Sequence, residues 1–342
     1  MAKILVTGGC GYIGSHTIID LINNGFEPIC VDNNVRSSAK VLEEVTAISK
    51  QSVPHYAVDA CDMEALRVVF EDHQDLAGVI HFAAYKSVPE SVVRPLDYYR
   101  NNLNSLLNIL ELIAEYKVPN FIFSSSCAVY GNSTELPVTE QTPMLAAQSP
   151  YAATKQMGEQ IVQDFAKANP EIKNILMRYF NPAGAHPSGL IGEFPQDGAY
   201  NVIPILVECL VGIRGQFGVT GNDYDTRDGT CIRDYIHVMD VANAHTKALQ
   251  YLQKKSTPDN CEAFNIGIGK GLTILELIEA FDRATGQKVD YKIGSRRAGD
   301  VAAVYSDYSK AKQYLGWSPQ YDVDDIMQSV WKWTEYSKWY RN

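Results

Sequence analysis

The sequence predicts an α/β protein built on a doubly wound parallel sheet, with a smaller mixed α/β lobe towards the C-terminus. Short apolar runs typical of buried strands alternate with helical patterns from residue 3 to residue 180. A glycine-rich turn joins the first strand to the first helix, and loops rich in proline and glycine begin after Asn181. Strands that alternate with helices form a parallel sheet with helices on both faces. We therefore expect one domain over residues 1–180 and a second over residues 181–342, some of whose segments return to the sheet.

The first domain is predicted from six strand-like runs and the helical patterns between them. The strand-like runs are 3–7, 28–32, 55–59, 78–82, 121–126 and 174–180. The first helical pattern ends near Asn24, and later ones cover 62–72, 96–116 and 151–168. Ligands of such sheets bind beyond the carboxyl ends of the strands. The residues that fall at these ends are Asp32, Asp59, Phe82, Ser124 to Ser126 and Tyr179 to Asn181.

The turn after the first strand carries the pattern G-x-G-x-x-G, at Gly9, Gly11 and Gly14. Such glycines let the backbone approach a pyrophosphate at a helix N-terminus, and Asp32 can accept a hydrogen bond from a ribose 2′-hydroxyl. A lone glycine pattern is more often a simple turn, but this strand–turn–helix setting favours a Rossmann-type dinucleotide site. Asp32 favours NAD over NADP because its carboxylate would repel a 2′-phosphate, a preference that Arg36 weakens slightly.

The chain after residue 181 reads as a mixed lobe that covers the sheet. Its loop-like stretches are 182–189, 193–201 and 221–229. Helical patterns cover 202–212, the residues up to 253, 274–285, 308–315 and 326–336, with strands near 217 and 264–267. Because the first domain already holds the cofactor motif, this lobe is the expected place for the rest of a substrate.

Composition excludes several classes of protein. The 342 residues are 46% hydrophobic and 20% charged, as in an ordinary globular protein. A formal net charge of −10 argues against binding to a nucleic-acid backbone. No run of 18 apolar residues and no N-terminal signal pattern is present, and the seven cysteines form no C-x-x-C motif. The seven histidines show no metal-like clustering. We expect a soluble, cytoplasmic, metal-free protein that binds neither membrane nor nucleic acid.

The predicted helix after Pro150 places Tyr151 and Lys155 on one face, because residues four apart are neighbours on a helix. A phenol has a pKa of about 10, so it becomes a useful base only when a cation stabilises its anion. Together with a dinucleotide site, the pair suggests hydride transfer at a carbinol carbon, with the tyrosine as acid and base. The alternative is that Tyr151 and Lys155 have no catalytic role and simply belong to an ordinary amphipathic helix. A third group should bind the same substrate oxygen, and Ser126 is well placed, although chemistry alone does not choose among Ser124, Ser125 and Ser126.

Motifs in both predicted domains resemble the extended short-chain dehydrogenase/reductases, and more narrowly the UDP-glucose (UDP-galactose) 4-epimerase family. The resemblance covers nearly the whole chain. The residues that carry it are Thr7 to Gly14, Ser124 to Ser126, Ser149 to Lys155, Arg178 to Pro182, Gly184 to Pro187, Gly221 to Tyr224 and Arg233 to Asp240.

The resemblance implies a redox-neutral 4-epimerisation of UDP-hexoses. Tyr151 takes the 4-hydroxyl proton, bound NAD takes the C4 hydride, and hydride returns to the other face of the 4-keto sugar. It implies that Lys155 holds the ribose and tunes Tyr151, and that Ser126 holds the sugar oxygen. It also implies a homodimer through the helices at 96–116 and 151–168.

The same resemblance implies two sets of contact residues. The NAD contacts are Gly8, Gly11, Tyr12, Ile13, Gly14, Asp32, Asn33, Asp59, Ala60, Phe82, Ala83, Lys86, Asn101, Ser124, Tyr151, Lys155 and Tyr179. The UDP-sugar contacts are Lys86, Ser126, Tyr151, Phe180, Asn181, Asn201, Val202, Thr220, Arg233, Tyr235, Arg297, Asp300 and Val304. For each arginine taken singly, a surface ion pair is the commoner role.

Three other functions are weighed against epimerisation. Related 4,6-dehydratases carry an Asp-Glu pair for removing water where this chain has Cys127 and Ala128, so elimination lacks its catalysts. A UDP-glucuronate 4-epimerase or decarboxylase is the runner-up, although no further arginine is clearly dedicated to a sugar carboxylate. A non-catalytic NAD-binding scaffold would not need Ser126, Tyr151 and Lys155 together.

Two departures from glucose-restricted members of the family concern the pocket. Val304 occupies a position often filled by tyrosine beside the sugar 2-substituent, so we expect the N-acetylated substrates UDP-GlcNAc and UDP-GalNAc to be accepted too. The alternative is that Val304 is a core residue and that Tyr305 fills the space beside the sugar 2-substituent. Thr220 replaces a phenylalanine near the expected uracil site.

Overall fold

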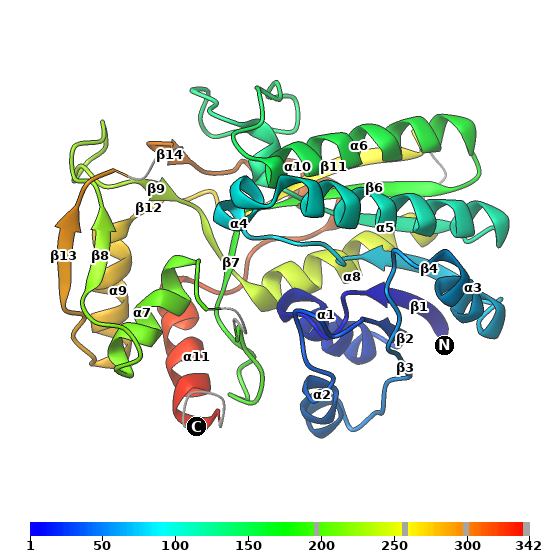
Figure 1. Cartoon of the computed structure of the whole chain (residues 1–342), viewed down its shortest axis with the longest axis horizontal. Helices are drawn as coiled ribbons and strands as arrows, with labels where there is room; N and C mark the ends of the chain where they lie inside the picture. The colour runs from blue at the N-terminus through cyan, green and yellow to red at the C-terminus, as the bar shows by residue number, and fades with distance from the viewer. Residues whose placement is uncertain (195–197, 255–258, 297–300, 338–342) are drawn as a thin grey trace.

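The computed structural model describes residues 1–194, 198–254, 259–296 and 301–337. Its centre is a seven-stranded parallel sheet, here called the main sheet, with the strand order β11-β6-β5-β4-β1-β2-β3 (Figure 1). The doubly wound parallel sheet predicted from the sequence is therefore confirmed. Its strands are β1 (Ala2–Thr7), β2 (Phe26–Val31), β3 (His55–Tyr56), β4 (Leu76–His81), β5 (Asn120–Ser126), β6 (Lys173–Tyr179) and β11 (Cys261–Ile266).

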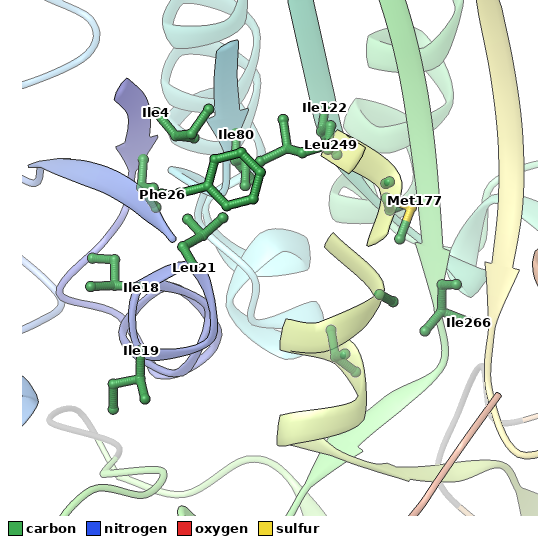
Figure 2. Packing of buried hydrophobic residues seen from close by; sticks show 14 of the residues in the cluster. Ile4, Ile18, Ile19, Leu21, Phe26, Ile80, Ile122, Met177, Leu249 and Ile266 are labelled. Carbon is green, nitrogen blue, oxygen red and sulfur yellow. The ribbon is translucent and has the colours of Figure 1, made fainter. Parts of the chain in front are cut away.

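Both faces of the main sheet are buried, which is why its strands read as continuous apolar runs. In β1, Ile4 and Val6 belong to the apolar cluster on one face, and Leu5 belongs to the cluster on the other face. Successive side chains of a strand point to opposite faces, so a single run fills both cores. Figure 2 shows the first cluster, in which Phe26 and Leu21 lie among isoleucines of the sheet and the first helix.

Helices cover the main sheet on both faces (Figure 1). The helices α1 (Tyr12–Asn23) and α8 (Val238–Lys254) pack together on one face. On the other face, α5 (Pro95–Glu115) packs against α6 (Pro150–Ala168). The sequence pattern did not indicate α2 (Val41–Ser49) or the short α4 (Val88–Val93), while α3 (Met63–Asp72) lies where a helix was expected.

One predicted strand is shorter in the structure, and a late segment of the chain belongs to the main sheet. The run at 55–59 forms a strand only over β3, because β2 offers it just two register partners, Cys30 and Val31. By contrast, β11 returns to the main sheet as expected, and its Phe264 lies opposite Met177 of β6. A segment from the C-terminal part of the chain therefore completes the sheet of the N-terminal part.

The remaining elements form a smaller group, here called the small-sheet lobe. It holds three sheets of two or three strands, with orders β10-β7, β12-β9-β14 and β13-β8. Its strands are β7 (Asn181–Ala183), β8 (Phe217–Thr220), β9 (Ile232–Arg233), β10 (Tyr235–His237), β12 (Leu272–Thr273), β13 (Tyr291–Gly294) and β14 (Ala303–Val304). Its helices are α7 (Val202–Leu210), α9 (Ile274–Thr285) and α11 (Val323–Tyr336), while α10 (Ser309–Leu315) packs on α8 and β11.

One apolar core joins the helices of the small-sheet lobe to its strands. Leu206 of α7, Phe281 of α9 and Met327 of α11 belong to the same buried cluster. Helix α9 begins with a capping box, in which Thr273 and Glu276 bind each other's backbone N–H groups. Among the described residues, no helix combines the length and the hydrophobicity that a membrane span requires.

Candidate active site

A cavity of about 270 Å³ opens at the carboxyl ends of the main-sheet strands. All the expected cofactor contacts line it except Ser124, and Tyr151 and Lys155 are part of its wall. The residues that line it are Gly8, Gly11, Tyr12, Ile13, Gly14, Val31, Asp32, Asn33, Arg36, Ser37, Val58, Asp59, Ala60, Phe82, Ala83, Ala84, Tyr85, Lys86, Ser87, Glu90, Asn101, Ser105, Tyr151, Lys155, Tyr179, Glu193, Phe194, Gly198 and Tyr200.

The glycine-rich turn is packed so closely that two of its positions require glycine. Gly8 has φ +70°, and a Cβ there would lie 2.8 Å from the backbone nitrogen of Ala83. A Cβ at Gly14 would lie 2.3 Å from the carbonyl oxygen of Gly8. Gly8, Gly11 and Gly14 line the cavity beside the N-terminus of α1, the arrangement that suits a pyrophosphate.

Asp32 is held rigidly at the end of β2. Its Oδ2 accepts a hydrogen bond from the Cys10 backbone at 3.0 Å, and its Oδ1 accepts from the Asn34 backbone at 2.9 Å and the Ser37 hydroxyl at 2.7 Å. Arg36 pairs with Glu90 at 2.6 Å across the cavity wall. Because Glu90 already compensates this arginine, the local charge still disfavours a 2′-phosphate, which supports NAD rather than NADP.

Tyr151 and Lys155 lie in the first turns of α6. Ser149 caps this helix by accepting a hydrogen bond from the Ala152 backbone, and Pro150 occupies the first turn, where its missing N–H costs nothing. The Lys155 Nζ donates to the Ser124 carbonyl at 2.6 Å and lies 6.0 Å from the centre of the Tyr151 ring. The sequence prediction that both side chains share one helical face is therefore confirmed.

Burial shifts both groups away from their charged forms. It lowers the pKa of Lys155, which is 4% exposed, to about 8, and the Glu159 carboxylate opposes this shift. Burial also raises the pKa of Tyr151 to about 12, and a hydrogen bond with Ser126 opposes it. A positive charge added to this cavity would bring the pKa of the phenol closer to neutral pH.

The structure separates the roles of the three serines at the end of β5. The hydroxyl of Ser124 lies 3.1 Å from His245 Nε2, and the hydroxyl of Ser125 donates to Glu159 at 2.5 Å. Of the three, Ser126 faces Tyr151, and its oxygen also accepts from the Ala128 backbone at 3.2 Å. Ser124 contributes to the site through its carbonyl, which receives Lys155, rather than by lining the cavity.

A buried ion pair below the site was not found from the sequence. Arg178 of β6 donates to both carboxylate oxygens of Glu159, at 2.9 and 2.6 Å, with side chains 4% and 1% exposed. Arg178 also donates to the Tyr130 hydroxyl at 3.0 Å, and that hydroxyl donates to Asn265 at 2.6 Å. The only local signal was the i, i+4 spacing of Lys155 and Glu159. The network ties α6 to β5, β6 and β11 directly behind Tyr151 and Lys155.

Of the expected substrate contacts, Lys86 and Tyr151 line the cavity, whereas the other described members lie on neighbouring segments outside its lining. Lys86 forms an ion pair with Glu193 at 2.8 Å, and Asn201, at the start of α7, donates to the same carboxylate at 3.1 Å. The amide of Asn181 donates to the Asp234 carbonyl at 2.9 Å. Phe180 packs with residues of the 3-10 helix η1 (Cys127–Tyr130). The other described members are Val202 in α7, Thr220 in β8, Arg233 in β9, Tyr235 in β10 and Val304 in β14. Arg297 and Asp300 lie outside the described residues.

Val304 and Arg233 are register partners in adjacent parallel strands, so these two expected substrate contacts are neighbours. Arg233 donates to the Val301 carbonyl at 2.8 Å, which fixes the start of this segment. Val304 also packs against the buried cluster of Phe180 and Val138. It is half-buried and is not among the residues that line the cavity of about 270 Å³.

The buried carboxylate of Asp234 is the anchor of this region. Its Oδ2 accepts from the Ser306 hydroxyl at 2.6 Å, the Ser306 backbone at 3.0 Å and the Gly269 backbone at 3.2 Å, and its Oδ1 accepts from the Ile268 backbone at 2.9 Å. Burial raises the pKa of Asp234, and the hydrogen bonds from Ser306, Ile268 and Gly269 oppose this rise. Asp234 thereby sets the positions of Arg233 and Val304, although the sequence motif suggested no role for it.

Two further contacts connect the main sheet to the small-sheet lobe across the site. The Tyr12 hydroxyl donates to the Gly184 carbonyl at 2.6 Å, so the glycine-rich turn is bound to the end of β7. Tyr85, Phe194 and Tyr200 also line the cavity, and no local motif marked them. They were missed because they lie on connecting segments whose positions depend on the packing of both parts of the chain.

Known proteins of similar sequence place this geometry in a family. The family described as GDP-mannose 4,6 dehydratase matches residues 5–330. The UDP-glucose 4-epimerase of Dictyostelium discoideum is 44% identical over 331 residues, which cover 97% of this chain and 95% of that relative. The chain belongs to the UDP-glucose 4-epimerase family. Its extended short-chain dehydrogenase/reductase resemblance is thereby confirmed.

Solved structures of UDP-glucose 4-epimerases share the whole fold. The Bifidobacterium longum enzyme, in complex with NAD+ and UDP, has a TM-score of 0.93 at 42% identity, covering 98% of each chain. The UDP-Glc/GlcNAc 4-epimerase of Campylobacter jejuni has a TM-score of 0.84 at 36% identity, covering 98% of this chain and 100% of that one. Although the matching family description names a dehydratase, Cys127 and Ala128 supply no carboxylate beside Ser126 here.

Proposed function

We propose that the protein is an NAD-dependent UDP-hexose 4-epimerase in which Tyr151 is the acid and base. One observation carries the proposal: Tyr151 and Lys155 form part of the wall of the same cavity as the glycine-rich turn and Asp32. The residues present fit the cofactor, since Gly8, Gly11 and Gly14 line the cavity without side chains at the N-terminus of α1, and Asp32 offers an acceptor for a ribose hydroxyl.

When bound, NAD+ supplies a hydride acceptor for C4 of the sugar. Tyr151 accepts the proton of the 4-hydroxyl as that carbon is oxidised to the ketone, and Ser126 holds the same oxygen. After the 4-keto sugar has presented its other face, Tyr151 returns the proton as hydride is returned. Atoms and electrons balance within one cycle, so no NADH is released.

Lys155 makes this chemistry possible near neutral pH. Its ammonium, fixed by the Ser124 carbonyl, stabilises the phenolate of Tyr151 and thereby opposes the burial that raises the pKa of the phenol. Glu159, one helical turn further on and neutralised by Arg178, opposes the loss of the lysine proton. Activity should therefore fall as the pH rises through about 8, where Lys155 becomes neutral.

The small-sheet lobe is the proposed site for the UDP moiety. The carriers proposed for it are Asn181 in β7, Asn201 at the start of α7 and Arg233 in β9, which are three separate elements of this lobe. An arginine beside a diphosphate provides a charge-assisted hydrogen bond. Thr220, at the end of β8, is proposed beside the uracil, where its hydroxyl can replace an aromatic contact.

N-acetylated UDP-hexoses are proposed as additional substrates. The half-buried Val304 offers a small side chain next to Arg233, where a tyrosine would fill the space beside the sugar. We expect Val304→Tyr to lose activity on UDP-GalNAc while keeping activity on UDP-galactose. Val304→Ile, which adds only one methylene, is the matched control. Equal activity of Val304→Tyr on both substrates would contradict this assignment.

A homodimer is proposed through α5 and α6. These neighbouring helices leave Leu96, Leu107 and Met157 exposed, although large apolar side chains are normally buried. Sedimentation equilibrium should give twice the mass of the chain, and Leu107→Asp should shift the protein to monomer.

A cytoplasmic location is also proposed. It agrees with the seven cysteines, all of which are free thiols.

The deciding experiment is an assay with purified protein and UDP-galactose. The proposal predicts conversion to UDP-glucose without net NADH, loss of conversion in Tyr151→Phe, and recovery of NAD from the denatured protein. Recovery of NADP would contradict the interpretation of Asp32, and inactivity on all UDP-hexoses would favour a non-catalytic scaffold.

A further inference from the structure

Two cysteines and a histidine that are far apart in the sequence meet behind the glycine-rich turn. Cys10 lies in that turn, Cys30 lies near the end of β2, and His55 begins β3. The two sulfurs are 3.6 Å apart, and one potential ligand atom from each of the three residues lies within 4.8 Å of the others. Cys30 and His55 are register partners in adjacent parallel strands, so their side chains point to the same face of the sheet.

The spacing of the two sulfurs matches that of a tetrahedral thiolate site. With Zn–S bonds of about 2.3 Å, two sulfurs on a tetrahedral ion are separated by about 3.7 Å. The sulfurs already have this separation, so only the imidazole has to approach further. Gly9 makes the arrangement possible, because a Cβ at that position would lie 2.6 Å from the Cys30 sulfur.

We propose that Cys10, Cys30 and His55 form a binding site for one divalent cation that prefers sulfur ligands, such as Zn²⁺. Two thiolates and an imidazole are ligands that such ions prefer, and the two thiolate charges neutralise a divalent cation. Charge neutrality matters here because Cys10 and Cys30 belong to the buried apolar cluster of the main sheet, where an unbalanced ion would be costly.

Cys10 also lies at the edge of a smaller cavity. It lines this cavity of about 70 Å³ together with Ser38 and Glu44 near the start of α2. The smaller cavity adjoins the proposed NAD cavity, since both are lined by Gly11, Tyr12 and Arg36. The His55 Nε2 lies 3.3 Å from the Asp32 carbonyl, which holds the ring close to the sulfurs.

Binding must displace protons, since each thiol loses its hydrogen when its sulfur bonds the metal. The divalent ion and two thiols give the bis-thiolate complex and two protons, with no change of oxidation state. The hydrogen bond with Cys10 and burial raise the pKa of the Cys30 thiol, so this group stays protonated at neutral pH without a metal. Affinity should therefore increase with pH. The charged groups beside Cys10 are Asp32, which accepts its backbone hydrogen bond, and Glu44 and Arg36, which line the same small cavity.

The experiment is a titration of the purified, nucleotide-loaded protein with Co²⁺ and then Zn²⁺, under a non-thiol reductant. We expect one equivalent of Co²⁺ to produce a thiolate-to-metal charge-transfer absorbance, Zn²⁺, which binds such ligands more tightly, to displace it, and bound Zn²⁺ to raise the melting temperature. Cys10→Ser and Cys30→Ala should each weaken binding at least about tenfold, and His55→Gln should weaken it less.

The matched control is Cys209→Ser, which removes a half-buried thiol far from the cluster in sequence and should bind like the wild type. Circular dichroism and nucleotide content establish that each variant is folded. Absence of the absorbance from the wild-type protein would overturn the proposal, as would its persistence in folded Cys10→Ser. A band lost only in Cys209→Ser would also overturn it, because the ion would then bind elsewhere.

Discussion

In the main sheet, residues that line the cavity lie at or just after the ends of β1, β2, β3, β4 and β6. In the small-sheet lobe, expected substrate contacts such as Thr220, Arg233 and Tyr235 lie on three sheets of two or three strands. The first group is positioned by strand register and by backbone contacts such as Gly8 against Ala83. The second depends on buried polar anchors, above all Asp234 with its bonds to Ser306 and Gly269. The difference indicates that the cofactor side depends on close backbone packing at positions such as Gly8, while the lobe depends on side-chain anchors and can change a half-buried residue such as Val304 without losing them.

The largest effect is expected at Lys155, the buried cation of the main-sheet side. Lys155→Met should reduce turnover by about 10²- to 10⁴-fold, because Tyr151 loses the charge that stabilises its phenolate. The same change should stabilise the fold by about 1–3 kcal/mol at pH 7, since burial lowers the pKa of Lys155 from 10.5 to about 8 and so disfavours its protonated form.

The stability gain in Lys155→Met should be complete below pH 8 and should shrink as the pH rises towards 10.5, where the unfolded chain also loses the proton. Urea unfolding across this range measures it. Lys167→Met, an exposed position of the same helix, is the control and should change neither quantity appreciably. A less stable Lys155→Met would show that the ammonium contributes net stability.

A smaller but still severe effect is expected when one carbon is added to the glycine-rich turn. Gly14→Ala should cost about 3 kcal/mol and deplete bound NAD, because its Cβ would lie 2.3 Å from the Gly8 carbonyl oxygen. The matched change in the lobe is Gly218→Ala in β8, where no atom lies within 4 Å of the added carbon. NAD content after denaturation and thermal melting measure the contrast. Equal behaviour of the two variants would break the comparison between the main sheet and the lobe.

The anchor of the lobe should give an intermediate effect with a different signature. Asp234→Asn should cost about 2 kcal/mol, because one amide N–H group would face the backbone donors of Ser306 and Gly269. We expect a higher KM for the UDP-sugar with unchanged NAD content, since only the lobe side of the cavity shifts. The control is Asp225→Asn at an exposed position. Loss of NAD from folded Asp234→Asn would argue that this anchor also supports the cofactor side.

The smallest effect is expected at the half-exposed pair of Arg227 and Glu276 on the lobe surface. Arg227→Gln should cost about 0.5 kcal/mol or less, because solvent screens such pairs, and added salt should reduce the cost further. Chemical denaturation at low and high salt measures the difference in unfolding free energy between the wild type and Arg227→Gln. A cost comparable to that of Asp234→Asn would show that surface pairs also hold the lobe together.

The sequence predicted the main sheet well because each of its units carries local information. The glycine pattern, Asp32 at a strand end and the four-residue spacing of Tyr151 and Lys155 are all readable within one strand or helix. The expected cofactor contacts accordingly line one cavity, apart from Ser124, whose carbonyl rather than hydroxyl serves the site.

What the sequence did not reveal depends on contacts between distant segments. Glu159 meets Arg178 only when α6 packs on β6, and Asp234 meets Ser306 only when three short strands assemble. The cluster of Cys10, Cys30 and His55 has separations of 20 and 25 residues in the chain, so no metal motif was recognisable. Two of the predicted UDP contacts, Arg297 and Asp300, lie outside the described residues.

Two contacts made by cavity-lining residues join distant segments of the chain, the ion pair of Lys86 with Glu193 and the bond from Tyr12 to the Gly184 carbonyl. On the proposed function they oppose opening of the site, so we expect bound nucleotide to exchange with free nucleotide slowly compared with turnover. On the proposed function, hydride then moves only between the sugar and the nucleotide bound to the same protein molecule. The ratio of the two sugars alone sets the direction of the reaction, and the balance of oxidised to reduced nicotinamide in the surrounding cell has no influence on it.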